Sequence, residues 1–246
     1  MKKITLGTKM IGDGLVACER EAISLVMTGN VLVNDHPASS IHEKITPDST
    51  IRIRTSKGNF VTRAGDKLAW GLSSFAVTVA GKVCLDIGCA EGGFTDCLLQ
   101  NGAAKVYAVD VARGTFAWQL RNDERVTLLE KTNARYLNRQ LIPEPIDFFC
   151  CDVSFISLQK ILPVAAKLLT PTGSFIVLYK PQFELPRSQI GKNGIPHDPD
   201  DIKTGIAALT AFAAAHNIFI RQSTASPLQG SKGNVEYLLY GDCGGG

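Results

Sequence analysis

The sequence predicts an α/β protein in which a small N-terminal α+β domain precedes a doubly wound, seven-stranded sheet. Two observations support this prediction. Strand-like and helix-like patterns alternate from residue 81 onward, whereas the first third of the chain shows a helix followed by short alternating strands. The 246 residues are 45% hydrophobic and 20% charged, which suits one large or two small globular domains and leaves little room for disorder.

Composition and pattern together divide the chain into three parts. We expect a first domain over 1–58, a linker and the start of the second domain over 59–80, and the remainder of that domain over 81–243. Residues 1–80 hold ten Lys and Arg against seven Asp and Glu, while the rest of the chain holds sixteen of each. The excess of positive charge therefore lies in the first third, which weakly favours an anion-binding N-terminal domain.

The N-terminal domain is expected to contain one helix and a small sheet. Apolar residues at helical spacing predict a helix over 10–27. Strands are predicted at 31–36 and 50–54, and the alternation of the second strand places Arg52 and Arg54 on one face. Those two arginines fit either a solvated strand face or a surface that contacts RNA.

The second domain is expected to alternate strands with helices. Strands are predicted at 83–87, 105–110, 126–130, 146–152, 173–179, 218–223 and 235–240. Helices are predicted at 94–101, 115–121, 157–169 and 199–216. The stretch from Pro181 to Pro199 shows no clear periodicity, so we expect a long loop over the strand ends, where such folds keep their sites.

A strand, turn and helix that begin at Val83 indicate a nucleoside-bearing cofactor. The turn has the pattern D-x-G-x-x-x-G-G from Asp86 to Gly93, and a second strand ends at Asp110. Glycines allow close approach of a ligand, and an acidic residue about 20 positions on can accept hydrogen bonds from ribose hydroxyls. The G-x-G-x-x-G pattern of dinucleotide enzymes is absent. S-adenosylmethionine therefore fits this Rossmann-like turn better than NAD, with a dehydrogenase and a non-binding α/β core as the alternatives.

Four charged residues stand where this architecture would bring them to one cleft. Asp152 and Lys180 end the fourth and fifth strands, so they should be neighbours at the carboxyl edge of the sheet. Glu236 opens the last strand and reaches the same edge if that strand is antiparallel. Lys67 lies shortly before the sheet. Taken singly, a charged residue at a strand end is usually one that leaves the core, but four residues of alternating sign that converge on one cleft favour a functional site.

Methyl transfer from a sulfonium to a ribose 2′-hydroxyl would use such a set. The hydroxyl is a poor acid, so its proton needs a well-placed base. A lysine can be that base where burial or a second cation favours its neutral form. Lys67 beside Lys180 would meet this condition, with Asp152 and Glu236 orienting the amines, and the reaction needs no metal.

The chain resembles a known family in these motifs. The set Lys67, Asp152, Lys180 and Glu236 is similar to the tetrad of the FtsJ-like ribose 2′-O-methyltransferases. The phrases around it, such as Asp152-Val153-Ser154-Phe155, Lys180-Pro181-Gln182-Phe183-Glu184 and Gly233-Asn234-Val235-Glu236-Tyr237, resemble the TlyA family, often labelled hemolysin A. The resemblance implies an N-terminal RNA-binding domain of the ribosomal-protein S-four type and a Rossmann-like methyltransferase that modifies cytidine 2′-hydroxyls of ribosomal RNA with S-adenosylmethionine.

The resemblance and the turn together give the expected site residues. The catalytic residues would be the tetrad, and the RNA partner would be ribosomal RNA or a ribosomal subunit. The expected cofactor contacts are Asp86, Gly88, Cys89, Gly92, Gly93, Phe94, Asp110, Val111, Asn133 and Asp152. The expected RNA contacts are Arg20, Arg52, Arg54, Arg63 and Lys232.

Two stretches depart from the family pattern. Residues 4–10 stand where members have Arg-Leu-Asp at the first helix, so we expect that helix to be atypical. The turn contains Cys89-Ala90-Glu91 where the family prefers Ala-Ser-Thr. The Glu91 carboxylate would either be accommodated at the helix N-terminus or repel the carboxylate of the cofactor's methionine.

The cysteines and the N-terminus indicate the compartment. The seven cysteines form no C-x-x-C pair and fall mostly in apolar patterns, which indicates reduced thiols in the cytoplasm. The four histidines are scattered, so no metal site is expected. Lys9 and Asp13 interrupt what would be a signal-peptide core, and no apolar run approaches a membrane span. We therefore expect no stable membrane association. An RNA-binding protein without catalysis and a membrane-active hemolysin remain as alternative functions.

Overall fold

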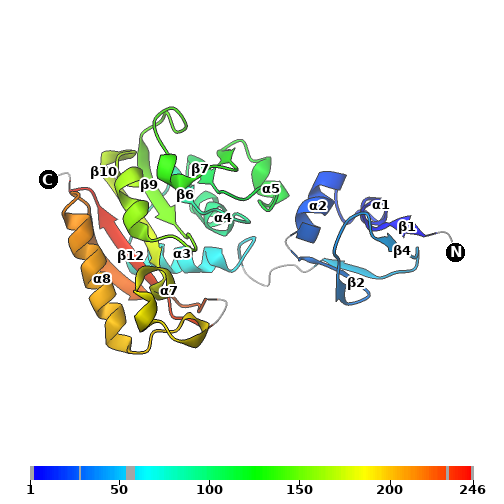
Figure 1. The fold of residues 1–246 in the computed structure, drawn as a ribbon. Coiled ribbons are helices and arrows are strands. Elements are labelled where there is room, and N and C mark those ends of the chain that lie inside the picture. Colours follow the sequence, from blue (N-terminus) through cyan, green and yellow to red (C-terminus); the bar gives the residue numbers. More distant parts are fainter. Residues whose placement is uncertain (1–2, 28, 54–58, 231–232, 245–246) are drawn as a thin grey trace.

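The computed structural model describes residues 3–27, 29–53, 59–230 and 233–244. A small N-terminal body lies beside a larger α/β body (Figure 1). The two differ in architecture, as the sequence predicts. None of the helices formed by the described residues combines the length and hydropathy that crossing a bilayer requires.

The N-terminal body packs two helices against two small antiparallel sheets. The helices are α1 (Leu6–Gly12) and α2 (Glu19–Met27). One sheet pairs β1 (Ile4–Thr5) with β4 (Lys44–Ile45), and the other has the order β3-β2-β5. Its strands are β2 (Val31–Val33), β3 (His36–Pro37) and β5 (Ile51–Ile53). Buried apolar side chains of both helices and of β2 form one core between these elements.

The expected single helix over 10–27 is wrong, because the chain turns between two helices. Gly14 adopts a φ of +70°, which the left-handed region makes easy only for glycine. Within the atypical residues 4–10, Ile4 and Thr5 form β1 and the helix α1 begins at Leu6. Its start is capped by Thr5, whose hydroxyl accepts a hydrogen bond from the Thr8 amide at 3.2 Å.

The larger body is built on a seven-stranded sheet with the order β11-β12-β10-β9-β6-β7-β8. The strands from β6 to β10 run parallel to their neighbours, while β12 is antiparallel to both β10 and β11. Their bounds are β6 (Val83–Ile87), β7 (Lys105–Val109), β8 (Val126–Leu129), β9 (Ile146–Cys151), β10 (Leu169–Tyr179), β11 (Phe219–Ala225) and β12 (Tyr237–Asp242). All seven strands predicted from the sequence are present, with ends shifted by a few residues.

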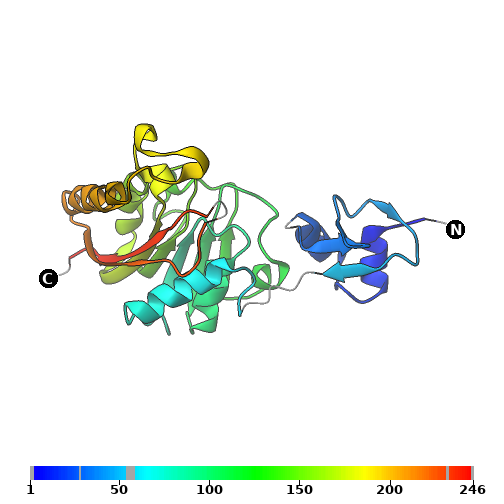
Figure 2. The ribbon, with the colours of Figure 1, turned by 90° about the horizontal axis from the view of Figure 1, so that it is seen from below.

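Helices cover both faces of the sheet, as the view in Figure 2 shows. One face packs against α3 (Ala64–Ser74) and α4 (Gly93–Gln100). The other packs against α6 (Leu162–Ala166) and α8 (Pro199–Ala214). Successive residues of β6 point to opposite cores, with Cys84 on the first and Leu85 on the second. This two-sided burial is the doubly wound arrangement.

Several connecting segments differ from the sequence prediction. Residues 64–74, for which no helix was expected, form α3. The expected helix over 157–169 is a 3₁₀ turn, η2 (Leu158–Lys160), followed by the short α6, because β10 already begins at Leu169. The expected loop after Pro181 contains short turns of helix, namely α7 (Pro181–Glu184), η3 (Arg187–Gln189) and η4 (Lys192–Gly194). The other short helices are α5 (Trp118–Arg121) and η1 (Ala134–Tyr136).

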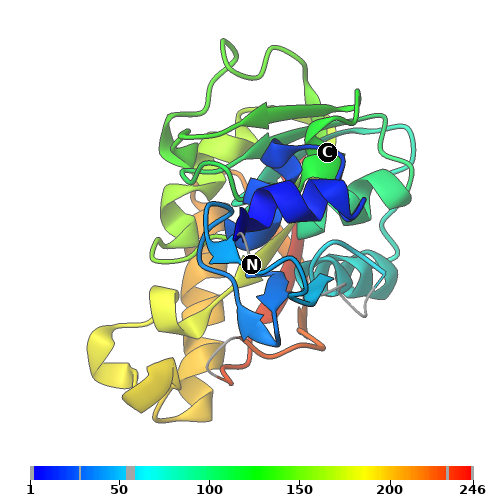
Figure 3. The same ribbon diagram turned by 90° about the vertical axis from the view of Figure 1, so that its right-hand side faces the viewer.

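The two bodies meet at α2 and the segment that leads into α5. Figure 3 shows the N-terminal body in front of the larger one. The Arg20 guanidinium lies 5.7 Å from the centre of the Trp118 ring. The Ser24 hydroxyl donates to the carbonyl oxygen of Phe116 at 3.3 Å. The N-terminal body is therefore placed against the side of the sheet that carries the cofactor turn.

Candidate active site

Two ion pairs lie at the carboxyl edge of the sheet, and three of their four side chains are buried. Asp152 follows β9 and Lys180 follows β10, and the Lys180 ammonium lies 2.5 Å from Asp152 Oδ1. Lys180 Nζ also donates to the Ser154 hydroxyl at 3.1 Å. The parallel pairing of β9 with β10 makes these two strand ends neighbours, so the expected juxtaposition is confirmed.

The second pair joins residues 169 positions apart in sequence. Lys67 on α3 donates to Glu236 Oε2 at 2.6 Å, and both side chains are buried. Glu236 directly precedes β12, and the Tyr179–Tyr237 pairing of β10 with β12 places Glu236 at the level of Lys180. The antiparallel final strand that the sequence analysis required is therefore present.

Burial of these charged side chains requires that each has a partner of opposite charge. Lys67, Lys180 and Glu236 are each less than 10% exposed. An unpaired charge at such depth costs several kcal/mol, whereas two opposite pairs sum to zero charge. The expected role of Asp152 and Glu236 in orienting the amines agrees with this geometry.

Three cavities meet at these pairs. The nucleoside cavity, of about 550 Å³, lies at the ends of β6 and β7 and is lined by residues that include Asp110, Val111 and Asn133. The loop cavity, of about 320 Å³, lies beside the glycine turn. The tetrad cavity, of about 510 Å³, contains Lys67 and Glu236 in its wall.

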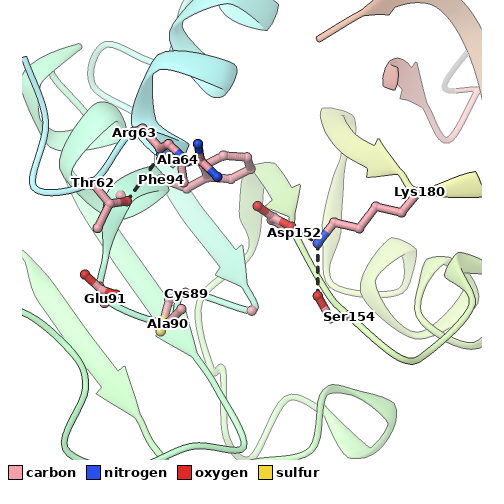
Figure 4. Close-up of a pocket in the computed structure, with 12 residues that line it drawn as sticks. Thr62, Arg63, Ala64, Cys89, Ala90, Glu91, Phe94, Asp152, Ser154 and Lys180 are labelled. Carbon is pink, nitrogen blue, oxygen red and sulfur yellow. Dashed lines mark hydrogen bonds and ion pairs between the residues drawn. The ribbon is translucent and has the colours of Figure 1, made fainter. Parts of the chain in front are cut away.

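Shared lining residues show how the cavities connect. Gly88 and Asp152 line both the nucleoside cavity and the loop cavity. Lys180 and Arg63 line both the loop cavity and the tetrad cavity. In Figure 4, Asp152, Ser154 and Lys180 stand together on one side of the loop cavity, with Glu91 on the opposite side. An elongated ligand can therefore extend from Asp110 past the glycine turn to Lys180.

The glycine turn is shaped for close approach. Gly88 has a φ of +82°, and a Cβ at this position would lie 2.4 Å from the carbonyl oxygen of Asp152. Gly92 has a φ of +98°, and a Cβ at this position would lie 2.5 Å from Leu120 Cδ1. The turn is tied to β7 because Asp110 Oδ2 accepts a hydrogen bond from the Ala90 amide at 2.8 Å. Asp110 retains lone pairs for ribose hydroxyls, so the residues present fit an adenosyl cofactor.

The expected cofactor residues divide into two groups. Asp86 and Gly92 line none of the three cavities and shape the turn from beneath. Asp86 is fully buried, accepts a hydrogen bond from the Thr95 hydroxyl at 2.7 Å, and has its pKa raised to about 7 by burial. The other expected cofactor residues all line the nucleoside cavity or the loop cavity. They are Gly88, Cys89, Gly93, Phe94, Asp110, Val111, Asn133 and Asp152.

Glu91 lies in the wall of the loop cavity, two residues before α4 begins. Burial raises the pKa of its carboxyl group, and among the described residues none donates a hydrogen bond to it. The exposed Arg63 lines the same cavity. The cavity is therefore lined by two acidic side chains, Glu91 and Asp152, and two basic ones, Arg63 and Lys180, which suits a zwitterionic amino acid.

The expected RNA contacts are dispersed. Arg63 lines two of the cavities, Arg20 lies on Trp118 at the contact between the two bodies, and Arg52 pairs with Asp35 at 2.9 Å on an exposed strand. Arg54 and Lys232 lie outside the described residues. Sequence reasoning assigned no role to Ser154, Gln182 and Asn234, which line the tetrad cavity. Their only signal was a position within two residues of Asp152, Lys180 or Glu236. Among the described residues, no group of three or more His, Cys, Asp or Glu is placed to hold a metal ion.

The doubly wound sheet, the glycine turn and the cavity that continues from it to two lysines define an S-adenosylmethionine-dependent methyltransferase. The chain belongs to the FtsJ-like methyltransferase family, whose model matches residues 60–243, and within it to the group of proteins named TlyA or hemolysin A. The resemblance noted in the motifs is thereby confirmed.

Relatives match nearly the whole chain. A Bacillus subtilis protein, YqxC, described as a candidate rRNA methyltransferase, is 40% identical over 97% of this chain and 85% of its own length. The 16S/23S rRNA (cytidine-2′-O)-methyltransferase TlyA of Mycobacterium tuberculosis is 37% identical over 97% of this chain and 90% of its own. A solved structure from Streptococcus thermophilus, described as a candidate hemolysin, has a TM-score of 0.73 at 37% identity, and the match covers 98% of this chain and 88% of that one.

Gly88→Ala tests the close approach at the turn. The added methyl group would meet the Asp152 carbonyl oxygen at 2.4 Å, so the turn must shift. We expect S-adenosylmethionine to bind at least about tenfold more weakly by isothermal titration and unfolding to become easier by ~1–3 kcal/mol. Gly81→Ala is the matched control, because Gly81 has a φ of +73° but nothing within 4 Å of its Cβ position. Equal binding losses in the two variants would contradict this role.

Asp86→Asn tests the buried carboxyl group through the pH dependence of stability. The pKa of Asp86 is raised to about 7 in the fold, so the folded chain retains a proton that the unfolded chain releases above about 4. The wild type should therefore lose stability relative to Asp86→Asn as the pH rises through this window, by up to ~1.4 kcal/mol per pH unit. Denaturant unfolding of both chains from pH 4 to 8 measures this, and parallel profiles would refute it.

Proposed function

We propose that this chain transfers the methyl group of S-adenosylmethionine to the 2′-hydroxyl of a cytidine in ribosomal RNA. The observation that supports this most directly is the presence of two lysine–carboxylate contacts in the walls of the loop and tetrad cavities. The specific substrate is suggested by the name of the M. tuberculosis relative, an rRNA (cytidine-2′-O)-methyltransferase.

The position of Lys180 favours it as the group that meets the reacting hydroxyl. Lys180 lines both the loop cavity and the tetrad cavity, so it stands where the cofactor and the acceptor meet. When bound, S-adenosylmethionine supplies an electrophilic methyl group on a sulfonium. Lys180 in its neutral form can accept the hydroxyl proton as the oxygen forms its bond to the methyl carbon. Asp152 and Ser154 hold its amine in place by the contacts described above.

Lys67 and Glu236 line the tetrad cavity together with Lys180. Glu236 fixes the direction of the Lys67 ammonium through the 2.6 Å hydrogen bond. We assign Lys67 the role of holding the ribose.

An exposed aromatic ring marks the mouth of the tetrad cavity. Phe155 is 90% exposed and has a φ of +64°, an unusual conformation for a bulky residue. Its ring centre lies 4.9 Å from that of Phe183, and both rings line the cavity. Aromatic faces that project into solvent are the usual platforms for unstacked RNA bases. A nucleotide displaced from its stack can therefore rest on Phe155 with its ribose toward the tetrad.

The N-terminal body is proposed as an RNA-binding domain of the ribosomal-protein S-four type, over residues 1–58. Arg52 lies exposed on its β5 strand, and the exposed Arg63 lines the loop and tetrad cavities. Contacts of arginine with phosphate position RNA without reading its sequence. The partner would be ribosomal RNA or a ribosomal subunit, and the location the cytoplasm, where that partner is found.

Replacement of either lysine tests the catalytic assignment. Lys180→Ala and Lys67→Ala should reduce transfer of tritiated methyl groups from S-adenosylmethionine to ribosomal subunits by about 10²–10⁴-fold. The affinity for the cofactor, measured by isothermal titration, should change by no more than a few-fold, since other residues line the nucleoside cavity.

Lys167→Ala is the matched control for this experiment, because Lys167 is exposed and precedes β10 at the opposite edge of the sheet. It should retain wild-type transfer. Full transfer by Lys180→Ala would sink the proton-acceptor role. A wild-type chain that binds RNA but transfers no methyl group would instead favour an RNA-binding protein without catalysis.

A further inference from the structure

Two side chains that line the tetrad cavity carry a buried amide oxygen with unused hydrogen-bonding capacity. Gln182 and Asn234 both line this cavity. Gln182 Oε1 and Asn234 Oδ1 are buried, and neither has a hydrogen-bond partner among the residues that the structure describes. Asn234 is only 5% exposed. Buried acceptors are normally paired, so two such oxygens around one cavity require a reason.

Chain connectivity ties each amide to the proposed catalytic set. Gln182 follows Lys180 by two residues, with the rigid Pro181 between them, at the start of α7. Asn234 precedes Glu236 by two residues, and the Glu236 carboxylate is fixed by Lys67. The two amides are therefore held at set distances from the groups that meet the ribose.

The loop that contains η4 packs against both side chains. At Gly194, which has a φ of +78°, a Cβ would lie 3.1 Å from Asn234 Nδ2 and 3.2 Å from Gln182 Cβ. The loop backbone thus approaches both side chains at one point, and it is braced there by the Ile190–Pro196 bridge. This packing restricts the amides to few orientations, which suits groups that recognise a ligand.

The chemistry of the unpaired atoms indicates what they bind. Both are carbonyl oxygens, which accept hydrogen bonds and donate none. The exocyclic amino group of cytosine offers two N–H donors at its Watson–Crick edge, whereas uracil presents a carbonyl oxygen at the same position. An amide oxygen facing that position attracts the first base and repels the second.

We propose that Gln182 and Asn234 recognise the exocyclic amino group of the target cytosine and so select cytidine over uridine. The inference rests on the proposed function, since it concerns the base attached to the ribose that is methylated. Stacking on Phe155 would hold a base of either kind, because every base has a π-face. The two amides therefore supply the discrimination that the aromatic platform lacks.

The test compares two RNA targets that differ by one base. The methylated position is first mapped on ribosomal RNA treated with the full chain, and a transcript containing it is prepared with cytidine or uridine there. The wild type should prefer the cytidine transcript in kcat/KM by roughly 100-fold. Gln182→Ala and Asn234→Ala should each reduce this preference by about tenfold or more, mainly through slower reaction with cytidine.

Two further variants separate recognition from packing. Gln182→Glu retains acceptor oxygens at the same reach and should keep most of the cytidine preference that Gln182→Ala loses. Gln222→Ala is the control for a distant amide, because Gln222 is exposed on the edge strand β11. Cofactor affinity should be the same in all variants.

The outcomes distinguish this inference from the proposed function. A wild type that methylates no RNA overturns both. A wild type that methylates a cytidine, with alanine variants that slow the cytidine and uridine transcripts equally, overturns only the recognition role and leaves the amides as packing groups. A selective loss on cytidine that Gln182→Glu restores supports the assignment.

Discussion

The site depends on one constraint, which is that two lysines and two carboxylates share a buried edge of the sheet. Charges at this depth are tolerated only in pairs. Lys180 is paired because parallel β9 and β10 end together, and Lys67 is paired because antiparallel β12 begins at the same edge. Each pair forms only when two separate parts of the chain reach this edge, β9 with β10 for one pair and α3 with β12 for the other, so the charge pairing and the strand order support each other.

The cofactor turn is coupled to this edge through backbone contact. Gly88 can follow β6 only because it has no Cβ to meet the Asp152 carbonyl oxygen. Asp152 in turn faces Lys180. A displacement of the turn would therefore move Asp152, which contacts Lys180 directly. We expect binding in the nucleoside cavity and the position of Lys180 to depend on each other.

The sequence predicts the central sheet well because its signals are local. The strand Val83–Ile87 and the glycine turn follow directly from apolar runs and glycine spacing. Helix α3 was missed because its two glycines weaken the helical signal, and packing against α4 stabilises it instead. Asp86 was expected to contact the cofactor, yet its burial beneath the turn depends on Thr95 and the helix above it. The unpaired oxygens of Gln182 and Asn234 have no sequence signature, since burial without a partner exists only in the folded chain.

The segments Lys180-Pro181-Gln182 and Asn234-Val235-Glu236 each place an amide two residues from a charged group of the tetrad. A base bound by the two amides therefore places its ribose beside the lysines, because the short segments between the amides and the charged groups allow little relative movement. If both amides lose their partners, as with uracil, the ribose loses part of its alignment as well. Discrimination between bases should then appear in the rate of methyl transfer at least as strongly as in RNA affinity, because binding energy gained at the base is used to place the hydroxyl. This expectation separates recognition at the tetrad cavity from recognition by the N-terminal body, whose contacts would alter affinity for RNA with either base equally.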